Sequence, residues 1–438
     1  MKDLPALSTL GLKEKTFVEL SRRSLGKLAV ATGATAAVGT GAGYLIGRPA
    51  DAAATWKATG TAVPALVGFD NQMKAFMQAR GITAGQVAVT YKGRLVLARG
   101  YSTSTALAVQ PTSLFRIASL SKSLTAAAIV KLAQDGKLSL STPVANIIDI
   151  KPATGLTRDA RWSKITLWKV LQHLGGWDRD VSGDPEWKDA TISRALGVPM
   201  ELHTADVIKY VAGQKLDFDP GAKYVYSNFG YTLAGRVIEK VSGLSYENYV
   251  KQKLLAPLKI NRMALGYSLA KHSGETSYES QYTGPTVLDM SGKIVPAPYG
   301  SFSMRIQDAN GGWIASAPDL VRWAKMFDAP SSVLNSTSLG RVWAKPSIGV
   351  NSDGWYYGLG WQIRPVTGGT GRNTWHTGSM PGTYSIVVRT YNGMSWAAVF
   401  NRRDDASGKS YGDIDAALWT AANGVKTWPT NDLFPQYF

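Results

Sequence analysis

Residues 115–122 read FRIASLSK and begin a segment whose apolar residues recur at helical spacing. This pattern continues to Leu132 and predicts a helix over residues 119–134. Side chains three residues apart share a helix face, so Ser119 and Lys122 can meet one turn apart. A serine hydroxyl is a weak nucleophile until a nearby base takes its proton, and a desolvated lysine can be that base. The stretch therefore predicts a nucleophilic serine, with a helix-capping serine as the alternative.

The S-x-x-K pattern is weak by itself because the chain contains it three times. Ser24 and Lys27 lie in the N-terminal segment, and Ser268 and Lys271 lie in a polar stretch without a helical apolar face. Only the Ser119 pair begins a strong helix pattern, so we expect the reactive serine there.

A second candidate element reads Tyr226-Ser227-Asn228 and leads into a predicted helix over residues 228–241. Tyrosine can relay a proton, and the Asn228 amide can donate to a substrate carbonyl. The alternative is a core tyrosine followed by a capping asparagine. A similar triplet at residues 246–248 lies inside a charged amphipathic helix pattern, so we interpret it as a helix face.

The third element reads His376-Thr377-Gly378-Ser379 and follows a β-type run at residues 373–375. At a strand edge, the Ser379 amide could pair with the Ser119 amide as an oxyanion hole. His376 could hold a substrate carboxylate as an imidazolium, and Arg364 and Arg372 upstream could share that task. The alternative for His376 is a structural histidine.

The flanking segments predict how these elements are held. Hairpin patterns occur near both ends, around Lys92-Gly93 and around Asn392-Gly393, and a helix pattern follows at residues 414–422. The middle, residues 119–330, is mostly helical in pattern. We therefore expect an α+β fold, with one antiparallel sheet built from both chain ends, flanked by helices, and a mostly helical inserted subdomain.

The three elements, in this order and spacing, resemble the class C β-lactamase and D-alanyl-D-alanine carboxypeptidase family, which includes family VIII-type esterases. The resemblance covers residues 65–425. Further segments similar to the family are residues 170–176, 219–235, 311–320 and 357–361. The resemblance implies a β-lactamase-like fold. His376 departs from it, since class C β-lactamases have lysine there and some peptidases and esterases have histidine, which puts efficient lactam hydrolysis in doubt.

The resemblance implies acyl transfer through an acyl-enzyme on Ser119. It places Lys122 and Tyr226 with the nucleophile as catalytic residues, and either of them could be the base. Residues expected to bind substrate or the oxyanion are Asn228, His376, Thr377, Gly378 and Ser379. The expected substrate is a small molecule or peptide with an amide or ester group, for which peptidoglycan is one source. The alternative is a penicillin-recognising sensor or wall-binding protein with little turnover.

Composition excludes several other classes. The chain of 438 residues has no cysteine and four histidines, none at metal-ligand spacing, so we expect no metal and no cofactor. The net charge of +17 favours polyanions, but no nucleic-acid motif is present and we expect no nucleic-acid partner. Residues 408–412 match the G-x-S-x-G elbow, but no histidine follows them as that fold requires.

The N-terminal segment has the pattern of an export signal. Residues 21–27 read SRRSLGK, and a weakly apolar run over residues 28–46 leads to small residues at 50–54. This resembles a twin-arginine signal. We expect residues 1–54 to be the signal and residues 55–438 to be the β-lactamase-like hydrolase domain. The domain would be periplasmic or extracellular, or tethered to the membrane if the segment is retained.

Overall fold

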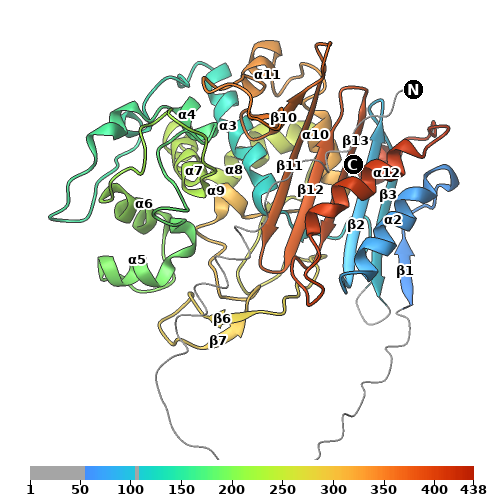
Figure 1. The fold of residues 1–438 in the computed structure, drawn as a ribbon, viewed down its shortest axis with the longest axis horizontal. Helices are drawn as coiled ribbons and strands as arrows, with labels where there is room; N and C mark the ends of the chain where they lie inside the picture. The colour runs from blue at the N-terminus through green and yellow to red at the C-terminus, as the bar shows by residue number, and fades with distance from the viewer. Residues whose placement is uncertain (1–54, 104–107) are drawn as a thin grey trace, which may run out of the picture.

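A computed structural model describes residues 55–103 and 108–438; the predicted export signal lies outside them. Its centre is an eight-stranded sheet in which every neighbouring pair is antiparallel (Figure 1). The strands, in spatial order, are β1 (Trp56–Thr59), β3 (Arg94–Thr103), β2 (Ala84–Tyr91), β13 (Met394–Phe400), β12 (Thr383–Arg389), β11 (Arg372–Met380), β10 (Gln362–Pro365) and β9 (Tyr356–Tyr357).

Both expected hairpins are present, and they meet in the middle of the sheet. In the first turn, Lys92 and Gly93 have φ of 47° and 76°, the left-handed values that such a tight connection needs. In the second, Gly393 has φ of 84°. Strand β13 pairs with β2 in a register that places Ala397 opposite Ala88. The prediction of one antiparallel sheet built from both chain ends is therefore confirmed.

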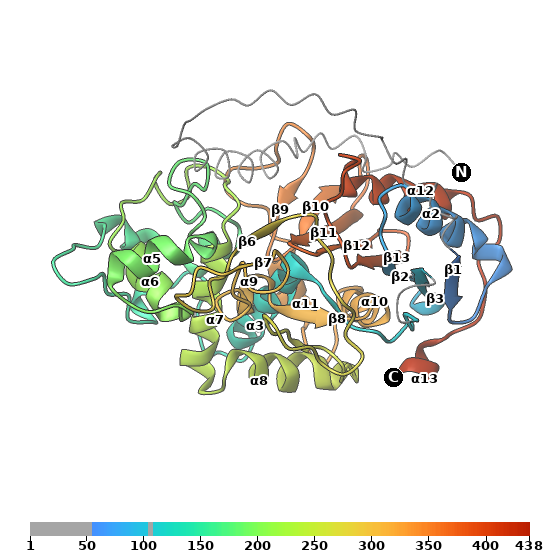
Figure 2. The same ribbon diagram turned by 90° about the horizontal axis from the view of Figure 1, so that it is seen from below.

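Helices cover both faces of this sheet. On one face α2 (Val67–Gln78) and α12 (Ile414–Asn423) lie side by side (Figure 2). The Trp419 ring of α12 meets the Trp396 ring of β13 edge-on, with centroids 4.8 Å apart. Both side chains are buried, and each contributes roughly 1.5–3 kcal/mol or more to the core. On the other face lies α10 (Ala317–Lys325).

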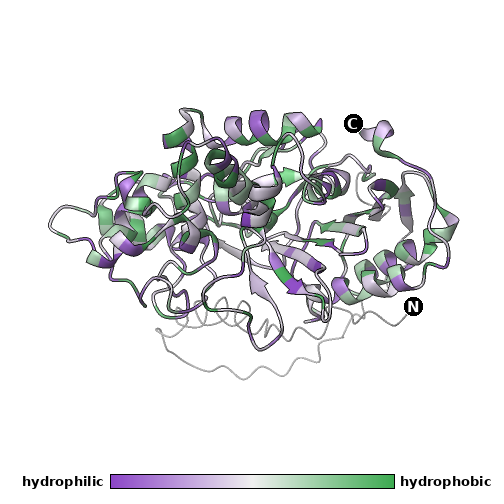
Figure 3. Cartoon of the chain, turned by 90° about the horizontal axis from the view of Figure 1, so that it is seen from above, coloured by the Kyte–Doolittle hydropathy of each residue, from purple (hydrophilic) through white to green (hydrophobic). Residues whose placement is uncertain are grey.

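The inserted part is mostly helical, as predicted. Its helices are α4 (Leu167–Leu171), α5 (Asp189–Leu196), α6 (Thr204–Ala212), α7 (Asn228–Ser242), α8 (Tyr246–Val250) and α9 (Asp308–Gly311), and α11 (Ser336–Val342) follows α10. Short strands β4 (Phe115–Arg116), β5 (Ala264–Leu265) and β8 (Trp313–Ala315) form a second sheet, and β6 (Thr283–Pro285) pairs with β7 (Ile294–Pro296). The outer helices carry both hydrophilic and hydrophobic residues (Figure 3).

Helix α3 (Ser121–Gln134) lies between the sheet and the inserted helices, and nearly all of its residues are buried. Three successive alanines, residues 126–128, let neighbouring elements approach closely. The predicted helix began at Ser119, whereas that residue lies on a 3-10 turn, Ala118–Leu120, just before α3. In residues 55–103 and 108–438, no helix combines the length and apolar character needed to cross a membrane.

Candidate active site

The turn that carries Ser119 is fixed by the central sheet. Ser119 is a partly exposed residue, and Ala118 before it has φ of 47°, an unfavourable value for a residue with a Cβ. Two hydroxyls of β12 hold the chain just before the turn: Ser385 donates to the Ile117 carbonyl (2.8 Å) and Thr383 to the Arg116 carbonyl (2.7 Å). These two bonds from the sheet hold the backbone of the turn in place, and a strained conformation can persist when its surroundings fix it in this way.

Lys122 lies one turn after Ser119, with its Nζ 3.1 Å from the Ser119 Oγ. The ammonium nitrogen also donates to the Asn228 Oδ1 (2.8 Å) and to the Asn310 carbonyl (2.7 Å). The side chain is fully buried. Burial lowers the pKa of Lys122 to about 7, while the carboxylates of Asp184 and Glu186 act in the opposite direction. A large part of the lysine is therefore neutral near pH 7.

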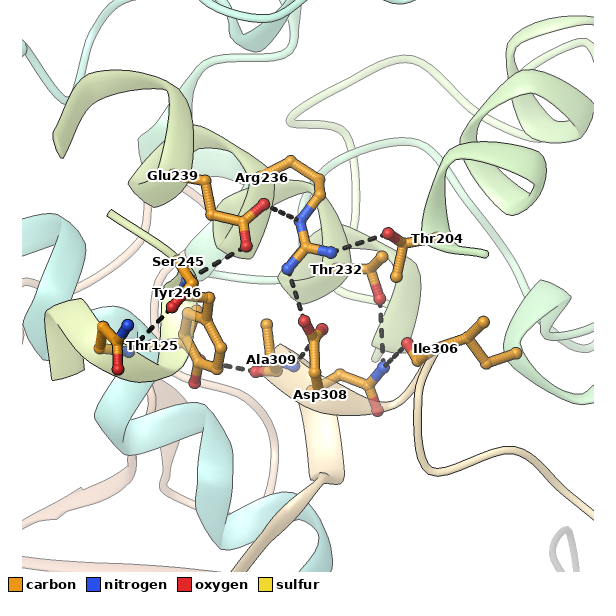
Figure 4. A network of polar contacts seen from close by, with 12 residues as sticks. Thr125, Thr204, Thr232, Arg236, Glu239, Ser245, Tyr246, Ile306, Asp308 and Ala309 are labelled. Carbon is orange, nitrogen blue, oxygen red and sulfur yellow. Dashed lines mark hydrogen bonds and ion pairs between the residues drawn. The ribbon is translucent and has the colours of Figure 1, made fainter. Parts of the chain in front are cut away.

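A polar network around α9 (Figure 4) holds the helix that contains Asn310. Asp308, the first residue of α9, pairs with Arg236 of α7 at 2.5 Å. Thr125 of α3 donates to the Ala309 carbonyl at 2.6 Å, and the Asn310 amide donates to Thr232 at 3.1 Å. Three helices thus fix the acceptor that faces Lys122.

Tyr226 precedes α7 and reaches the nucleophile. Its phenol is hydrogen-bonded with the Ser119 hydroxyl, and the Lys122 Nζ lies 4.9 Å from its ring centroid. Burial raises the pKa of Tyr226, against the smaller opposing effect of the Ser119 hydrogen bond. The phenol is therefore protonated at neutral pH. Ser227 caps α7 by accepting the Gly230 N–H (3.3 Å), which leaves the Asn228 side chain for the site.

Asn228 connects the lysine to a carboxylate that carried no motif in the sequence. Its Oδ1 accepts from Lys122, and its Nδ2 donates to the Asp184 Oδ2 at 2.6 Å. Burial raises the pKa of Asp184, against the Asn228 hydrogen bond, which lowers it. One of the two amide N–H groups of Asn228 is thus used within the protein, and the other remains for a substrate carbonyl.

His173 is a further residue that sequence reasoning did not single out, although it lies in the segment 170–176. Its carbonyl accepts the Val225 N–H (3.0 Å), and its Nδ1 accepts the Ser227 N–H (3.1 Å). The ring lies 4.3 Å from the Tyr226 ring. Burial lowers the pKa of His173 well below its usual value, so the imidazole is neutral. This side chain holds the loop that positions Tyr226.

Strand β11 forms the opposite wall, and residues 376–379 lie inside the strand rather than after it. A Cβ on Gly378 would lie 2.1 Å from the Ile117 carbonyl oxygen, so only glycine lets β11 approach the serine turn. Thr377 and Ser379 flank that glycine and are partly exposed. The structure thus brings the third element against the turn that carries Ser119.

The expectation that His376 acts as an imidazolium is wrong. Its Nε2 is 2.8 Å from the Tyr357 hydroxyl, and its Nδ1 is 2.6 Å from the Thr377 carbonyl. Burial, with a contribution from Lys122, lowers the pKa of His376 to about 3, so the ring is neutral at physiological pH. The structural-histidine alternative fits this position, and a neutral ring offers no cation to a carboxylate.

Arg364 and Arg372 have other contacts in this structure. Arg364 donates to the Asp353 carbonyl (3.1 Å), and Arg372 lies 5.6 Å from the Trp343 ring. Among residues 55–103 and 108–438, no three histidine or acidic side chains are grouped so that they could hold a metal ion.

Comparisons with known proteins agree with this architecture. The sequence profile of the family described as Beta-lactamase matches residues 69–418. The chain is 24% identical over 290 residues to Protein flp of Staphylococcus aureus, an alignment that covers 64% of this chain and 53% of the relative. The chain therefore spans about half the length of the curated relatives it matches.

Solved structures have the same fold. An octameric penicillin-binding protein homologue from Pyrococcus abyssi has a TM-score of 0.60 and 24% identity, with 83% of this chain and 79% of that chain covered. The D-amino acid amidase from Ochrobactrum anthropi has a TM-score of 0.61 and 20% identity, with 82% and 98% covered. Because the family profile matches most of the chain, this protein belongs to the beta-lactamase family.

Proposed function

We propose that this protein is an exported hydrolase that cleaves an amide or ester through an acyl-enzyme on Ser119. One observation carries the proposal: a fully buried lysine amine lies 3.1 Å from the serine hydroxyl, with its pKa lowered to about 7. Such an amine is partly neutral at working pH and accepts a proton readily. The protonated phenol of Tyr226 is the weaker candidate for the base, and we assign that role to Lys122.

The proposed reaction has two halves. The Ser119 Oγ attacks the acyl carbonyl while its proton passes to the neutral Lys122 Nζ. The tetrahedral intermediate then expels the leaving group, which receives that proton from Lys122 by way of the Tyr226 hydroxyl. Water next attacks the acyl-serine ester, releases the acid and restores the Ser119 hydroxyl. The amides of Ser119 and Ser379 receive the oxyanion in both halves.

The substrate-binding roles follow from the same arrangement. The free Asn228 N–H donates to a carbonyl on the acyl side, and Thr377 of β11 lies beside the scissile bond. Gly378 allows the strand to lie close enough, and His376 supports the wall behind Tyr226, from which its ring centroid is 6.5 Å away. No metal or cofactor is needed for these steps.

The lysine assignment predicts a specific pH dependence. Only neutral Lys122 accepts the serine proton, so kcat/KM should fall as pH drops through the lysine pKa of about 7 and level off above it. Below the midpoint the decline should approach about tenfold per pH unit. His376 stays neutral throughout and adds no second step between pH 5 and 8. The decrease of kcat/KM at low pH is measured from initial rates on a p-nitrophenyl ester across this range, corrected for spontaneous hydrolysis. A profile of kcat/KM that does not change with pH would exclude Lys122 as the base.

Similarity supports an amide as one substrate class. The D-stereospecific amidohydrolase from Streptomyces and the D-amino acid amidase from Ochrobactrum anthropi are each covered over 98% of their length by this chain. A peptide from peptidoglycan is a substrate that an exported enzyme would meet. Export itself rests on the twin-arginine-like segment, and we propose a periplasmic or extracellular location, with a membrane tether if that segment is retained. The alternative function is a penicillin-recognising sensor with little turnover.

Intact-mass spectrometry after mixing the protein with a penicillin tests the proposal. A transient adduct or none, with the penicillin consumed, indicates a turning-over hydrolase. A lasting adduct favours a slow peptidase or the sensor. If the penicillin stays intact and no adduct forms, p-nitrophenyl esters and D-amino acid amides are the next substrates. Failure to hydrolyse or to be acylated by any of them would overturn the proposed function.

A further inference from the structure

A short turn, residues 184–187, borders the site and is firmly anchored. The Asp184 Oδ2 accepts from Asn228, and its Oδ1 accepts the Glu186 N–H at 3.2 Å. The buried side chain of Glu186 accepts a hydrogen bond from the Thr232 hydroxyl of α7 at 2.6 Å. The backbone carbonyl of Glu186 accepts one from the Gln307 side chain at 3.0 Å. These bonds hold the turn at a fixed distance from Lys122, because Asn228 touches both.

The last residue of this turn, Trp187, extends the site with an apolar surface. Its ring packs on Phe302 with centroids 5.4 Å apart, yet 39% of the residue stays exposed. Phe302 belongs to a small buried cluster, separate from the main core, with Ala118, Met304 and Met380. Ala118 directly precedes Ser119, and Met380 directly follows Ser379. The buried Phe302 ring therefore connects the exposed indole of Trp187 to the segments that carry Ser119 and Ser379.

The loop that carries Phe302 is also rigid. The fully buried guanidinium of Arg116 donates to the Pro298 carbonyl (2.7 Å) and to the Tyr267 carbonyl (2.8 Å). Its carbon lies 5.7 Å from the Phe302 ring centroid. Since Arg116 also belongs to the segment fixed by β12, the Phe302 side and the Ser119 turn are held by one residue.

We propose that the exposed part of the Trp187 ring, supported from behind by the buried Phe302 ring, forms the acyl-binding wall, and that the preferred substrates carry an aromatic or other bulky apolar group on the acyl side of the scissile bond. This inference rests on the proposed function and narrows its substrate class. An exposed indole is stabilised when an apolar group covers it. Asn228 is bonded to Asp184, three residues before Trp187 on the same turn, so the proposed wall is tied to the residue that would receive the substrate carbonyl.

Two esters with the same leaving group test the wall: p-nitrophenyl phenylacetate and p-nitrophenyl acetate. We expect the wild type to prefer the phenylacetate, and Trp187→Ala to lower the phenylacetate-to-acetate ratio of kcat/KM by about tenfold or more. Trp187→Phe keeps an aromatic surface and should retain most of the ratio. Tyr391→Ala is the matched control, since Tyr391 is 49% exposed on a turn of the sheet and should leave the ratio unchanged.

The outcomes separate this inference from the function on which it rests. An unchanged ratio in folded Trp187→Ala, judged by its melting temperature, overturns the wall while ester hydrolysis stands. If Trp187→Ala and Trp187→Phe both lower the phenylacetate-to-acetate ratio to the same value, the preference depends on a specific contact of the indole and not on an aromatic surface in general. That result would overturn the proposal as stated. If the wild type hydrolyses neither ester, the wall proposal is overturned while amide hydrolysis through Ser119 still stands; hydrolysis that survives Ser119→Ala overturns the proposed function itself.

Discussion

Replacing Ser119 with alanine should lower kcat/KM by about four to six orders of magnitude and abolish every covalent adduct. The effect is large because the serine oxygen forms the bond that divides the reaction into two steps, and in residues 55–103 and 108–438 the Lys122 amine bonds to no other hydroxyl. Packing should change little, since the substitution removes one partly exposed oxygen from a turn held through its backbone by Ser385 and Thr383. Intact-mass labelling and initial rates measure both quantities.

Ser268→Ala is the matched control, because Ser268 begins another S-x-x-K pattern. Its hydroxyl accepts the Met304 N–H at 3.0 Å, while Lys271 donates instead to Ser277. That variant should keep its labelling and its rate. Labelling of Ser119→Ala at the wild-type rate would refute the nucleophile assignment.

Substituting Lys122 with methionine should lower kcat/KM by about two to four orders of magnitude. Methionine matches the length of the lysine stem without a proton acceptor, so the serine loses its base. The acid limb near pH 7 should vanish together with the activity. The Asn310 carbonyl and the Asn228 amide oxygen lose a donor, each at a cost of about 1–3 kcal/mol if left unpaired, so the melting temperature should also be recorded.

Lys131→Met on the same helix separates catalysis from helix stability. Lys131 pairs with Asp135 one turn later near the surface, at 2.5 Å, and should be kinetically silent. If Lys122→Met keeps most of the wild-type rate, the base must be another group, and Tyr226 is the one in contact with the serine.

The fold could be predicted because its signals are local. Asn392-Gly393 specifies a tight turn by itself, and alternating strands on both sides of it need no distant partner to be visible. The placement of Ser119 and Lys122 one turn apart is likewise a property of one short segment. The 3-10 turn that carries Ser119 could not be predicted from the sequence, because the turn depends on contacts of β12 with the chain at Ile117 and Arg116.

The remaining parts of the site depend on contacts between distant segments. Nothing near Asp184 indicates that it meets Asn228, and His173 shows its two bonds to the tyrosine loop only when α4 and α7 are packed. The state of His376 was misjudged for the same reason. Its ordinary pKa suits a pH-sensitive cation, but burial decides the outcome, and burial is a property of the whole fold.

Because β13 pairs with β2, the centre of the sheet can form only after the late strand has been synthesised. Residues 84–103 are made early and contain both strands of the first hairpin, but the other neighbour of β2 in the sheet is encoded much later, at residues 394–400. Until then the nascent hairpin presents an unpaired strand edge, the kind of surface that attracts other chains. Such long-range pairing is also slow to form. Recombinant production should therefore depend on chaperone supply, and a chain that stops before residue 394 lacks the strand that completes the centre of the sheet.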